Sequence, residues 1–300
     1  MELRQLKYFV KAAETLNFSE AAKALFVTQS TLSGGIRQLE EAMNVQLFQR
    51  NSRVVTLTEA GEELMPYAVQ ALHAADTCYD RIRDLQDMLT GTLNIGVTFS
   101  FSPILTETLL TFMKQYPHVK LNIHYKSMAE LMEMLQGRKL DFVLAFKPTE
   151  RYEGIESHTL FDNHLAAIVH RDRPLAQKEK ATLEEVTRYD LALPAKGLQA
   201  RNALDCVLSH YFCHLNIRIE LNEVNILLKL IRQSNLVTIL SEATTYNEQC
   251  VKAIPLDIPG NEMQGCVHTL KDAYRKHSAT EFIRLLSESN AIRERVRKWI

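Results

Sequence analysis

Residues 18–40 decide the fold of the N-terminal part, and they read FSEAAKALFVTQSTLSGGIRQLE. Ser19 is the expected N-cap of a short helix over residues 20–25, and Phe26-Val27 is the expected turn after it. Thr28 predicts the start of a longer helix that runs to about Met43. An apolar stripe also predicts a helix over residues 2–15. A short helix, a tight turn and a longer helix are typical of a helix-turn-helix domain.

The longer helix has two different faces. Leu32, Ile36, Leu39 and Met43 form the apolar face. Gln, Ser, Thr and Arg on the other face can reach base edges or phosphates. The alternative is an ordinary solvated face, because residues 30–36 carry no long polar side chain. The candidate DNA-contacting residues of this segment are Thr28, Gln29, Ser30, Thr31, Ser33, Arg37 and Gln38.

A short hairpin is expected after this helix. Residues 54–57 read VVTL, which predicts a strand, and Asn51-Ser52 predicts a tight turn before it. Arg50 and Arg53 flank that turn. Beside a helix-turn-helix, two arginines on a β-wing are well placed to bind phosphate.

Residues 59–90 predict a long connecting helix. Thr58 is its expected N-cap, and Gly91 is expected to end it. The apolar positions are spaced 4, 3, 4, 3, 4, 3 and 4, as in a coiled-coil seam, which favours a dimerisation helix. The alternative is an amphipathic helix packed on its own chain. The seam consists of Leu64, Ala68, Ala71, Ala75, Cys78, Ile82, Leu85 and Leu89.

Composition and charge narrow the class of protein. The 300 residues are 46% hydrophobic and 24% charged, typical of a globular protein with two or three domains. The net charge is −1 for the chain, but +2 over residues 1–57, −5 over 58–90 and +2 over 91–300. The near-zero total therefore does not exclude DNA. Because a head of +2 binds phosphate weakly, we expect DNA binding to need two heads held together.

Several sequence features favour the cytoplasm. The N-terminus lacks a signal-peptide core, and no apolar run reaches the length of a membrane span. Five cysteines form no C-x-x-C pair, which argues against a disulfide framework or a zinc finger. We predict no cofactor and no metal site.

The N-terminal run resembles the LysR-type transcriptional regulators. The matching motifs are FSEAAKAL, VTQSTLS, IRQLE, LFQR and LTEAG, in family order over about 60 residues. Ser30 departs from the pattern, since Pro is common there, and Gly34-Gly35 replaces a basic or polar pair.

The resemblance implies a function and a set of partners. The expected protein is a sequence-specific regulator, not an enzyme, that binds double-stranded operator DNA as a homodimer or homotetramer. It is expected to contact RNA polymerase and to respond to a small effector. By position, Gln29 to Gln38 match the recognition helix, and Arg50 and Arg53 match the wing.

The rest of the chain predicts an α/β body. Strands over residues 92–97, 119–124 and 142–146 alternate with helices over 103–116 and 128–137, which indicates βαβ units around a parallel sheet. This resembles the family's two-lobed effector domain of periplasmic-binding-protein type. By analogy, residues 91–300 form the body, with one lobe at about 91–161 plus 266–300 and the other at about 162–265.

The candidate effector site lies between these lobes. Ligands of such sheets bind at the carboxyl ends of strands, near helix N-termini, where a carboxylate or another anion is favoured. The candidate residues follow the predicted strands or match the family's cleft, and they are Thr98, Ser100, Phe101, Ser102, Ser127, Phe146, Lys196 and Arg201.

Two other functions stay open from sequence. Cys206, His210 and Cys213 share one face of a helix predicted over residues 201–214, so a redox- or metal-responsive regulator is the first alternative. Packing of the cysteines as small hydrophobes is the simpler interpretation. A solute-binding protein or an enzyme on the α/β domain is more distant, since common catalytic motifs are missing.

Overall fold

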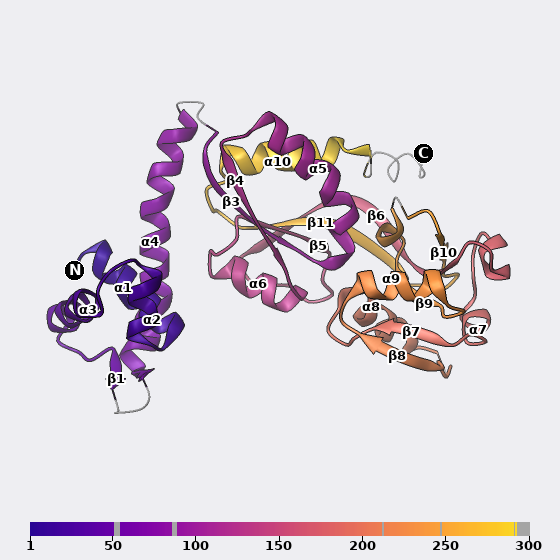
Figure 1. Ribbon diagram of the computed structural model, residues 1–300, viewed down its shortest axis with the longest axis horizontal. Helices are drawn as coiled ribbons and strands as arrows, with labels where there is room; N and C mark the ends of the chain where they lie inside the picture. Colours follow the sequence, from indigo (N-terminus) through magenta and orange to yellow (C-terminus); the bar gives the residue numbers. More distant parts are fainter. Residues whose placement is uncertain (51–54, 86–88, 212, 247, 291, 293–300) are drawn as a thin grey trace. The chain divides into compact units, whose positions relative to one another are not determined.

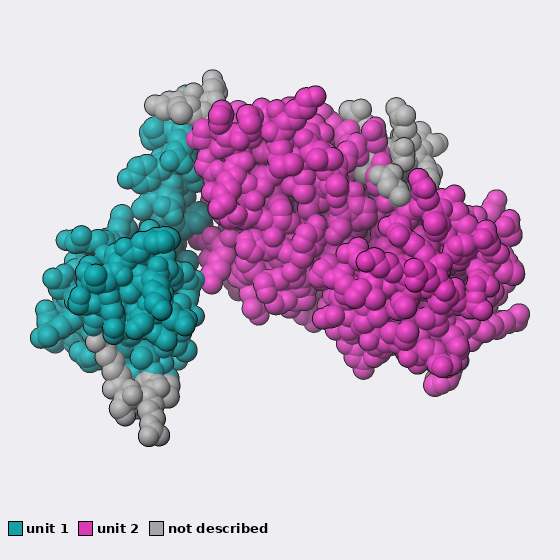
Figure 2. All heavy atoms as spheres, in the orientation of Figure 1, with its two compact units in different colours: residues 1–87 teal, residues 88–300 magenta. Residues whose placement is uncertain are grey.

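The computed structural model describes residues 1–50, 55–85, 89–211, 213–246, 248–290 and 292. The chain divides into two compact units, Met1–Asp87 and Met88–Ile300 (Figure 2). Each unit is described by itself.

The first unit is a small helical head with a hairpin and a long helix (Figure 1). Its apolar core lies between the helices and includes Phe9, Phe18 and Phe48, whose ring centroids are 5.2–5.6 Å apart where they pair. The antiparallel hairpin pairs Phe48 with Leu57. The elements are α1 (Leu3–Thr15), α2 (Phe18–Ala24), α3 (Gln29–Met43), β1 (Phe48–Arg50), β2 (Val55–Leu57) and α4 (Glu59–Leu85).

Two of the three predicted helix caps in the head are found. Thr28 Oγ1 accepts a hydrogen bond from the Thr31 amide, and Thr58 Oγ1 accepts one from the Gly61 amide at 3.1 Å. The prediction for α2 is wrong by two residues. Asn17, not Ser19, caps this helix and accepts from the amides of Ser19 and Glu20. Ser19 lies inside the first turn, where its own amide needs an acceptor.

Family motif residues join α3, the hairpin and α4. Glu40 is buried on α3, and its carboxylate accepts hydrogen bonds from the Leu47 and Phe48 amides at 2.9 and 3.3 Å. Thr58 Oγ1 also donates to the Gln46 carbonyl at 2.7 Å. These bonds hold the strand start against the helix that carries the polar face.

Helix α4 has two different halves. In the first half, Ala68 is buried, and Leu64 and Ala71 pack on the core of the head. This half therefore follows the alternative interpretation, in which the helix packs on its own chain. In the second half, Ile82 is 57% exposed and Leu85 is 81% exposed.

Two predictions about the end of α4 are wrong. Gly91 does not end the helix but begins the next strand with φ of +92°. Leu89, the last position of the predicted seam, packs on the core of the second unit. Leu89 falls at the next heptad position by sequence spacing, but it is not part of the described helix.

The second unit is built on a mixed sheet with the strand order β10-β6-β11-β5-β3-β4, and β9 also pairs with β6. Only the β3–β4 and β3–β5 pairs of this sheet are parallel. A separate parallel pair joins β7 and β8. The strands are β3 (Gly91–Val97), β4 (Val119–Tyr125), β5 (Phe142–Phe146), β6 (Ile155–His170), β7 (Leu191–Pro194), β8 (Ile217–Leu221), β9 (Thr238–Ser241), β10 (Val251–Pro255) and β11 (Glu262–Leu270).

Helices cover this sheet on both sides (Figure 1). The helices predicted after β3 and β4 are found, whereas α8 is shorter than predicted and ends at Leu208. The helices are α5 (Ser102–Gln115), α6 (Met128–Gln136), α7 (Leu183–Val186), α8 (Gln199–Leu208), α9 (Val224–Gln233) and α10 (His277–Glu288), with 3₁₀ turns at Phe99–Phe101, Pro174–Gln177 and Glu242–Thr245.

The predicted parallel pairing is found for β3, β4 and β5, but the sheet as a whole is mixed because of the long strands β6 and β11. Both run antiparallel to their neighbours in this sheet. Most of the first half of β6 is exposed, with polar residues such as Glu156 and His158, so it lacks the apolar run of a buried strand.

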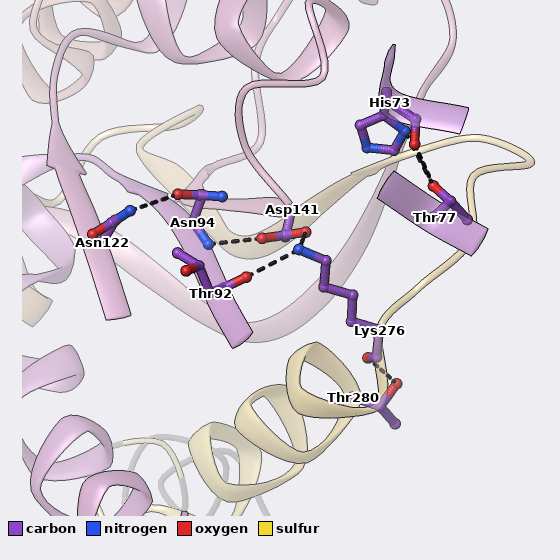
Figure 3. Close-up of polar contacts among 8 residues, drawn as sticks. All are labelled: His73, Thr77, Thr92, Asn94, Asn122, Asp141, Lys276 and Thr280. Carbon is purple, nitrogen blue, oxygen red and sulfur yellow. Dashed lines mark hydrogen bonds and ion pairs between the residues drawn. The ribbon is translucent and has the colours of Figure 1, made fainter. Parts of the chain in front are cut away.

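A polar cluster fixes the amino-terminal ends of the strands (Figure 3). Asp141, just before β5, accepts a hydrogen bond from the Asn94 amide at 2.7 Å and pairs with Lys276 at 3.0 Å. The Lys276 ammonium also donates to the Thr92 carbonyl, and Asn122 donates to the Asn94 side chain. The cluster thus ties β3, β4 and β5 to the start of α10, while the opposite ends of the strands carry the cavities described next.

Candidate functional site: a polar helix face and a cavity

The first candidate surface is the polar face of α3. Gln29, Ser30 and Thr31 are exposed at its start, where the Thr28 hydroxyl lies 2.9 Å from that of Ser30 and 2.8 Å from that of Thr31. This network orders the hydroxyls before any ligand binds. Small hydrogen-bonding side chains at an exposed helix start suit an approach to base edges and phosphates.

The same face continues over the next two turns. Ser33 is half-buried, whereas Arg37 and Gln38 are exposed. Arg37 pairs with Glu41 at 2.9 Å, and Gln38 accepts a hydrogen bond from Gln5 of α1 at 3.2 Å. An exposed ion pair is weak, so the guanidinium can exchange Glu41 for a phosphate.

The predicted wing arginines cannot be placed. Arg53 and the side chain of Arg50 lie outside the described residues, although the backbone of Arg50 ends β1. Their role stays a prediction.

The second candidate site consists of two cavities at the carboxyl ends of β3, β4 and β5. The smaller cavity has a volume of about 20 Å³, room for about one water molecule. The larger has about 1080 Å³, ample for a small organic ligand. Ser127, Met128 and Gln199 line both cavities.

Four of the eight predicted effector residues line these cavities. Thr98, Ser100 and Ser127 line the smaller one, and Ser127 and Phe146 line the larger one. They meet because the carboxyl ends of neighbouring parallel strands lie at one edge of the sheet. Lys126 lines the smaller cavity and is paired with Glu130. Lys147 lines the larger cavity, which Glu150, Asp162 and Glu262 also line.

The other four residues line neither cavity. Phe101 is buried, with its ring 5.2 Å from that of Phe146, because the 3₁₀ turn directs it inward. Its neighbour Phe99 lines the smaller cavity instead and stacks on Tyr125. Ser102 is half-buried and Lys196 is exposed.

Arg201 is buried on α8. Its side chain is only 6% exposed, pairs with Asp205 and Glu220, and donates to the Pro194 carbonyl at 3.1 Å. Burial alone would lower the pKa of Arg201, but the hydrogen bonds to Glu220 and Asp205 overcome this effect and raise the pKa above its ordinary value. The guanidinium therefore stays charged and is already paired.

Gln199, the first residue of α8, lines both cavities but was not among the residues predicted from the sequence. Its side-chain oxygen accepts from the Phe146 amide at 3.0 Å, and its nitrogen donates to the Phe146 carbonyl at 2.8 Å. This amide pairs with the end of β5 as another strand would, and it bridges segments 53 positions apart. The sequence carries one signal for it: Gln199 begins the helix that follows β7, and its side chain can both donate and accept hydrogen bonds.

Ser127 is held by a capping box at the start of α6. Its hydroxyl accepts from the Glu130 amide, and the Glu130 carboxylate accepts from the Ser127 amide at 3.1 Å. Hydrogen bonds from Lys126 and Ser127 lower the pKa of Glu130 to about 2. The cavity edge thus carries an ordered hydroxyl beside a paired Lys126.

The grouping of Cys206, His210 and Cys213 on one helix is wrong. Helix α8 ends at Leu208, so Cys213 is not on that helix. His210 Nδ1 lies 3.1 Å from the Cys206 carbonyl oxygen, within its own turn. Among the described residues, no group of three or more His, Cys, Asp or Glu side chains is arranged to hold a metal.

His268 of β11 is a buried titratable group beside β5. Its Nδ1 lies 2.8 Å from the Ser157 hydroxyl, and its Nε2 lies 3.3 Å from the Ala145 carbonyl oxygen. Burial lowers the pKa of His268 to about 4, although hydrogen bonds to the backbone of Ala145 and Phe146 favour the charged ring. The ring is therefore neutral in the folded protein at physiological pH.

His268 makes stability depend on pH in a defined window. Between the folded pKa of about 4 and the unfolded value of 6.5, the unfolded chain binds more protons, so stability falls as the pH falls through this range. His268→Gln should flatten this dependence by up to about 3 kcal/mol. Denaturant unfolding of the full chain at several pH values measures it. Equal slopes for both proteins would contradict the assignment.

Comparison with known proteins identifies the family. Residues 3–62 match the bacterial regulatory helix-turn-helix protein, lysR family, and residues 86–291 match the LysR substrate binding domain. The chain is 32% identical over 264 residues to the transcriptional dual regulator GltC of Bacillus subtilis. The aligned region covers 86% of this chain and 87% of that protein.

Solved structures share the fold. A full-length OxyR variant from Pseudomonas aeruginosa superposes with a TM-score of 0.71 at 22% identity and covers 98% of this chain and 95% of its own. Full-length CbnR in complex with its target DNA gives a TM-score of 0.55 at 21% identity, with coverage of 96% and 99%.

These matches confirm the resemblance seen in the sequence and the expected fold, a helix-turn-helix joined to an α/β effector domain. No helix in the described part of the chain is long and apolar enough to cross a membrane. The chain belongs to the LysR-type family of DNA-binding transcriptional regulators that carry an effector-binding domain.

Proposed function

We propose that this regulator reads its operator with the exposed start of α3. The observation that carries the proposal is the hydroxyl network of Thr28, Ser30 and Thr31, ordered and exposed beside Gln29. Ser33, Arg37 and Gln38 extend this surface, and Arg50 and Arg53 complete it as phosphate contacts of the wing. The proposed domains are residues 1–58 for DNA binding, 59–90 for the connector and 91–300 for effector binding.

Arg37→Ala tests the DNA surface. Each lost phosphate contact should lower the slope of log K against log salt by about 0.9, and the affinity should fall about tenfold or more. The control is Arg83→Ala, which removes an exposed arginine from α4. Fluorescence anisotropy with DNA from upstream of the protein's own gene gives both quantities. If the unaltered chain shows no salt-dependent binding, the operator proposal fails. If the unaltered chain binds but Arg37→Ala has the same affinity and the same salt slope, the proposed role of Arg37 fails.

We propose a homodimer, or a homotetramer built from it, joined through the second half of α4. Ile82 and Leu85 leave apolar surface exposed on this half, and Cys78 of the predicted seam is exposed beside them. Such a row is stabilised when a second helix covers it. Two heads of net charge +2 then act on one operator.

Ile82→Lys should therefore convert dimers to monomers, because a buried lysine in the seam would lose its hydration. Asp76→Lys, which adds the same side chain at an exposed position off the seam, is the matched control. Light scattering of the full chain gives the mass. An unchanged mass for Ile82→Lys would exclude this seam.

We propose that the effector is a small anion, such as a carboxylate, bound in the cavities between the two lobes. Lys147 provides a positive charge at the edge of the larger cavity, and Lys126, paired with Glu130, lies at the smaller one. The start of α6 beside Ser127 provides backbone hydrogen-bond donors. Thr98, Ser100 and Phe146 complete the proposed contacts. Binding would act by favouring one arrangement of the lobes over another.

We further propose that the protein works in the cytoplasm, contacts RNA polymerase and is not an enzyme. The support is the family assignment. A redox response through Cys206 would need a partner other than the helix face predicted from sequence, because Cys213 is not on α8.

A further inference from the structure

Phe26, in the turn of the helix-turn-helix, has an unusual backbone. The Phe26 amide donates to the Lys23 carbonyl at 3.1 Å, and the Val27 amide donates to the Ala22 carbonyl at 3.0 Å. This pair of bonds is the Schellman motif that ends α2. It requires a left-handed residue, and Phe26 has φ of +55°. Glycine, or less often asparagine, normally occupies this position.

The end of α3 shows the same motif with the expected residue. Asn44 has φ of +54°, and the Val45 amide donates to the Glu40 carbonyl at 3.1 Å. The same head therefore uses asparagine at one left-handed cap and phenylalanine at another, while Leu16 occupies a third at the end of α1. Phenylalanine is strained there because its Cβ crowds the backbone.

The Phe26 side chain gains little from the rest of the chain. It is 96% exposed, the highest fraction among the exposed large hydrophobic residues of the described part. A strained backbone and an exposed aromatic ring both oppose folding of the isolated protein. Features of this kind are most often found where a ligand binds.

The surroundings of Phe26 indicate the ligand. Phe26 lies two positions before the Thr28 cap of α3, and its exposed neighbours include Lys23, Gln29 and Ser30. A contact with a second copy of the chain would be expected within an apolar patch. An exposed ring close in sequence to Lys23, Gln29 and Ser30 better fits DNA, whose sugars and thymine methyl groups are apolar and lie beside phosphates.

We propose that the Phe26 ring is an apolar DNA contact, seated on a deoxyribose or a thymine methyl group at the edge of the groove that α3 enters. The proposal rests on the proposed operator surface and adds to it a contact that carries no charge. Loss of the ring should therefore weaken binding without changing its salt dependence, unlike the loss of Arg37.

Phe26→Asn tests the proposal, since asparagine accepts the left-handed backbone. Its expected result is an operator affinity about 5- to 30-fold lower, with the salt slope and the dimer mass retained and the melting temperature unchanged or higher, because the backbone strain is relieved. Phe26→Tyr keeps the ring and should retain the affinity. The matched control is Leu16→Asn, because Leu16 also has a left-handed backbone, with φ of +48°, and is 48% exposed, but lies outside the turn.

The outcomes separate clearly when anisotropy is measured on the full chain at several salt concentrations. An unchanged affinity of Phe26→Asn overturns the proposal, as does an equal loss in Phe26→Tyr. A smaller salt slope would show that the loss is ionic, and a changed dimer mass would show a subunit contact, so either result also overturns it. Failure of the unaltered chain to bind DNA would instead refute the operator surface itself.

Discussion

Gly61→Ala is expected to destabilise the head by about 3 kcal/mol or more and to abolish DNA binding. Gly61 lies in the first turn of α4, and its amide donates to Thr58 Oγ1. A Cβ at this position would lie 2.3 Å from the Leu47 carbonyl oxygen and 2.9 Å from the Leu57 side chain. Since the nearest atom belongs to the backbone, α4 or the hairpin would have to move.

Gly34→Ala is the matched control with the opposite sign. Gly34 lies inside α3 and is exposed, and no atom lies within 4 Å of the position of an added Cβ. Alanine favours a helix interior over glycine, so this variant should gain about 0.5–1 kcal/mol. Thermal unfolding of the full chain, with DNA binding as a second measurement, compares the two. A loss of stability in Gly34→Ala, or none in Gly61→Ala, would contradict this account.

Gly61 is an example of a feature of the head that could not be predicted from the sequence. The helices and the Thr28 cap follow from local spacing and capping chemistry, which act within one or two turns. The Gly61 contact joins positions 14 apart, and Glu40 binds amides seven and eight positions away. Both residues lie in the family motifs, but the contacts that require glutamate and glycine there form only when α3, the hairpin and α4 pack together.

The second unit also has features that could be predicted from the sequence and features that could not. The strand β5 could be predicted because each of its residues is apolar. In the structure each of them is buried. Strand direction was predicted correctly for β3, β4 and β5 from the alternation of strands and helices, but not for β6 and β11. Thr98 and Ser127 could be predicted to line the site because parallel strands end at one edge. The inward turn of Phe101 and the pairing of Arg201 with Glu220 depend on contacts that spacing does not encode.

Arg201→Met is the second variant expected to have a large effect. It removes a buried cation from between two carboxylates and leaves the Pro194 carbonyl without that donor. Breaking a buried pair usually costs several kcal/mol, but the Asp205 and Glu220 side chains are each 43% exposed and can be hydrated. We expect a loss of about 2–4 kcal/mol in the stability of the second unit.

Arg218→Met is the matched control, since Arg218 is 62% exposed and pairs with Asp190 at 3.1 Å on the surface of the same lobe. Its loss should change stability by less than about 1 kcal/mol. Denaturant unfolding of the full chain compares the two variants and tests the sequence-based role of Arg201. If Arg201 mainly bound an effector, Arg201→Met would unfold like the unaltered chain. A large loss without any effector present instead means that the guanidinium holds α8 against β7 and β8.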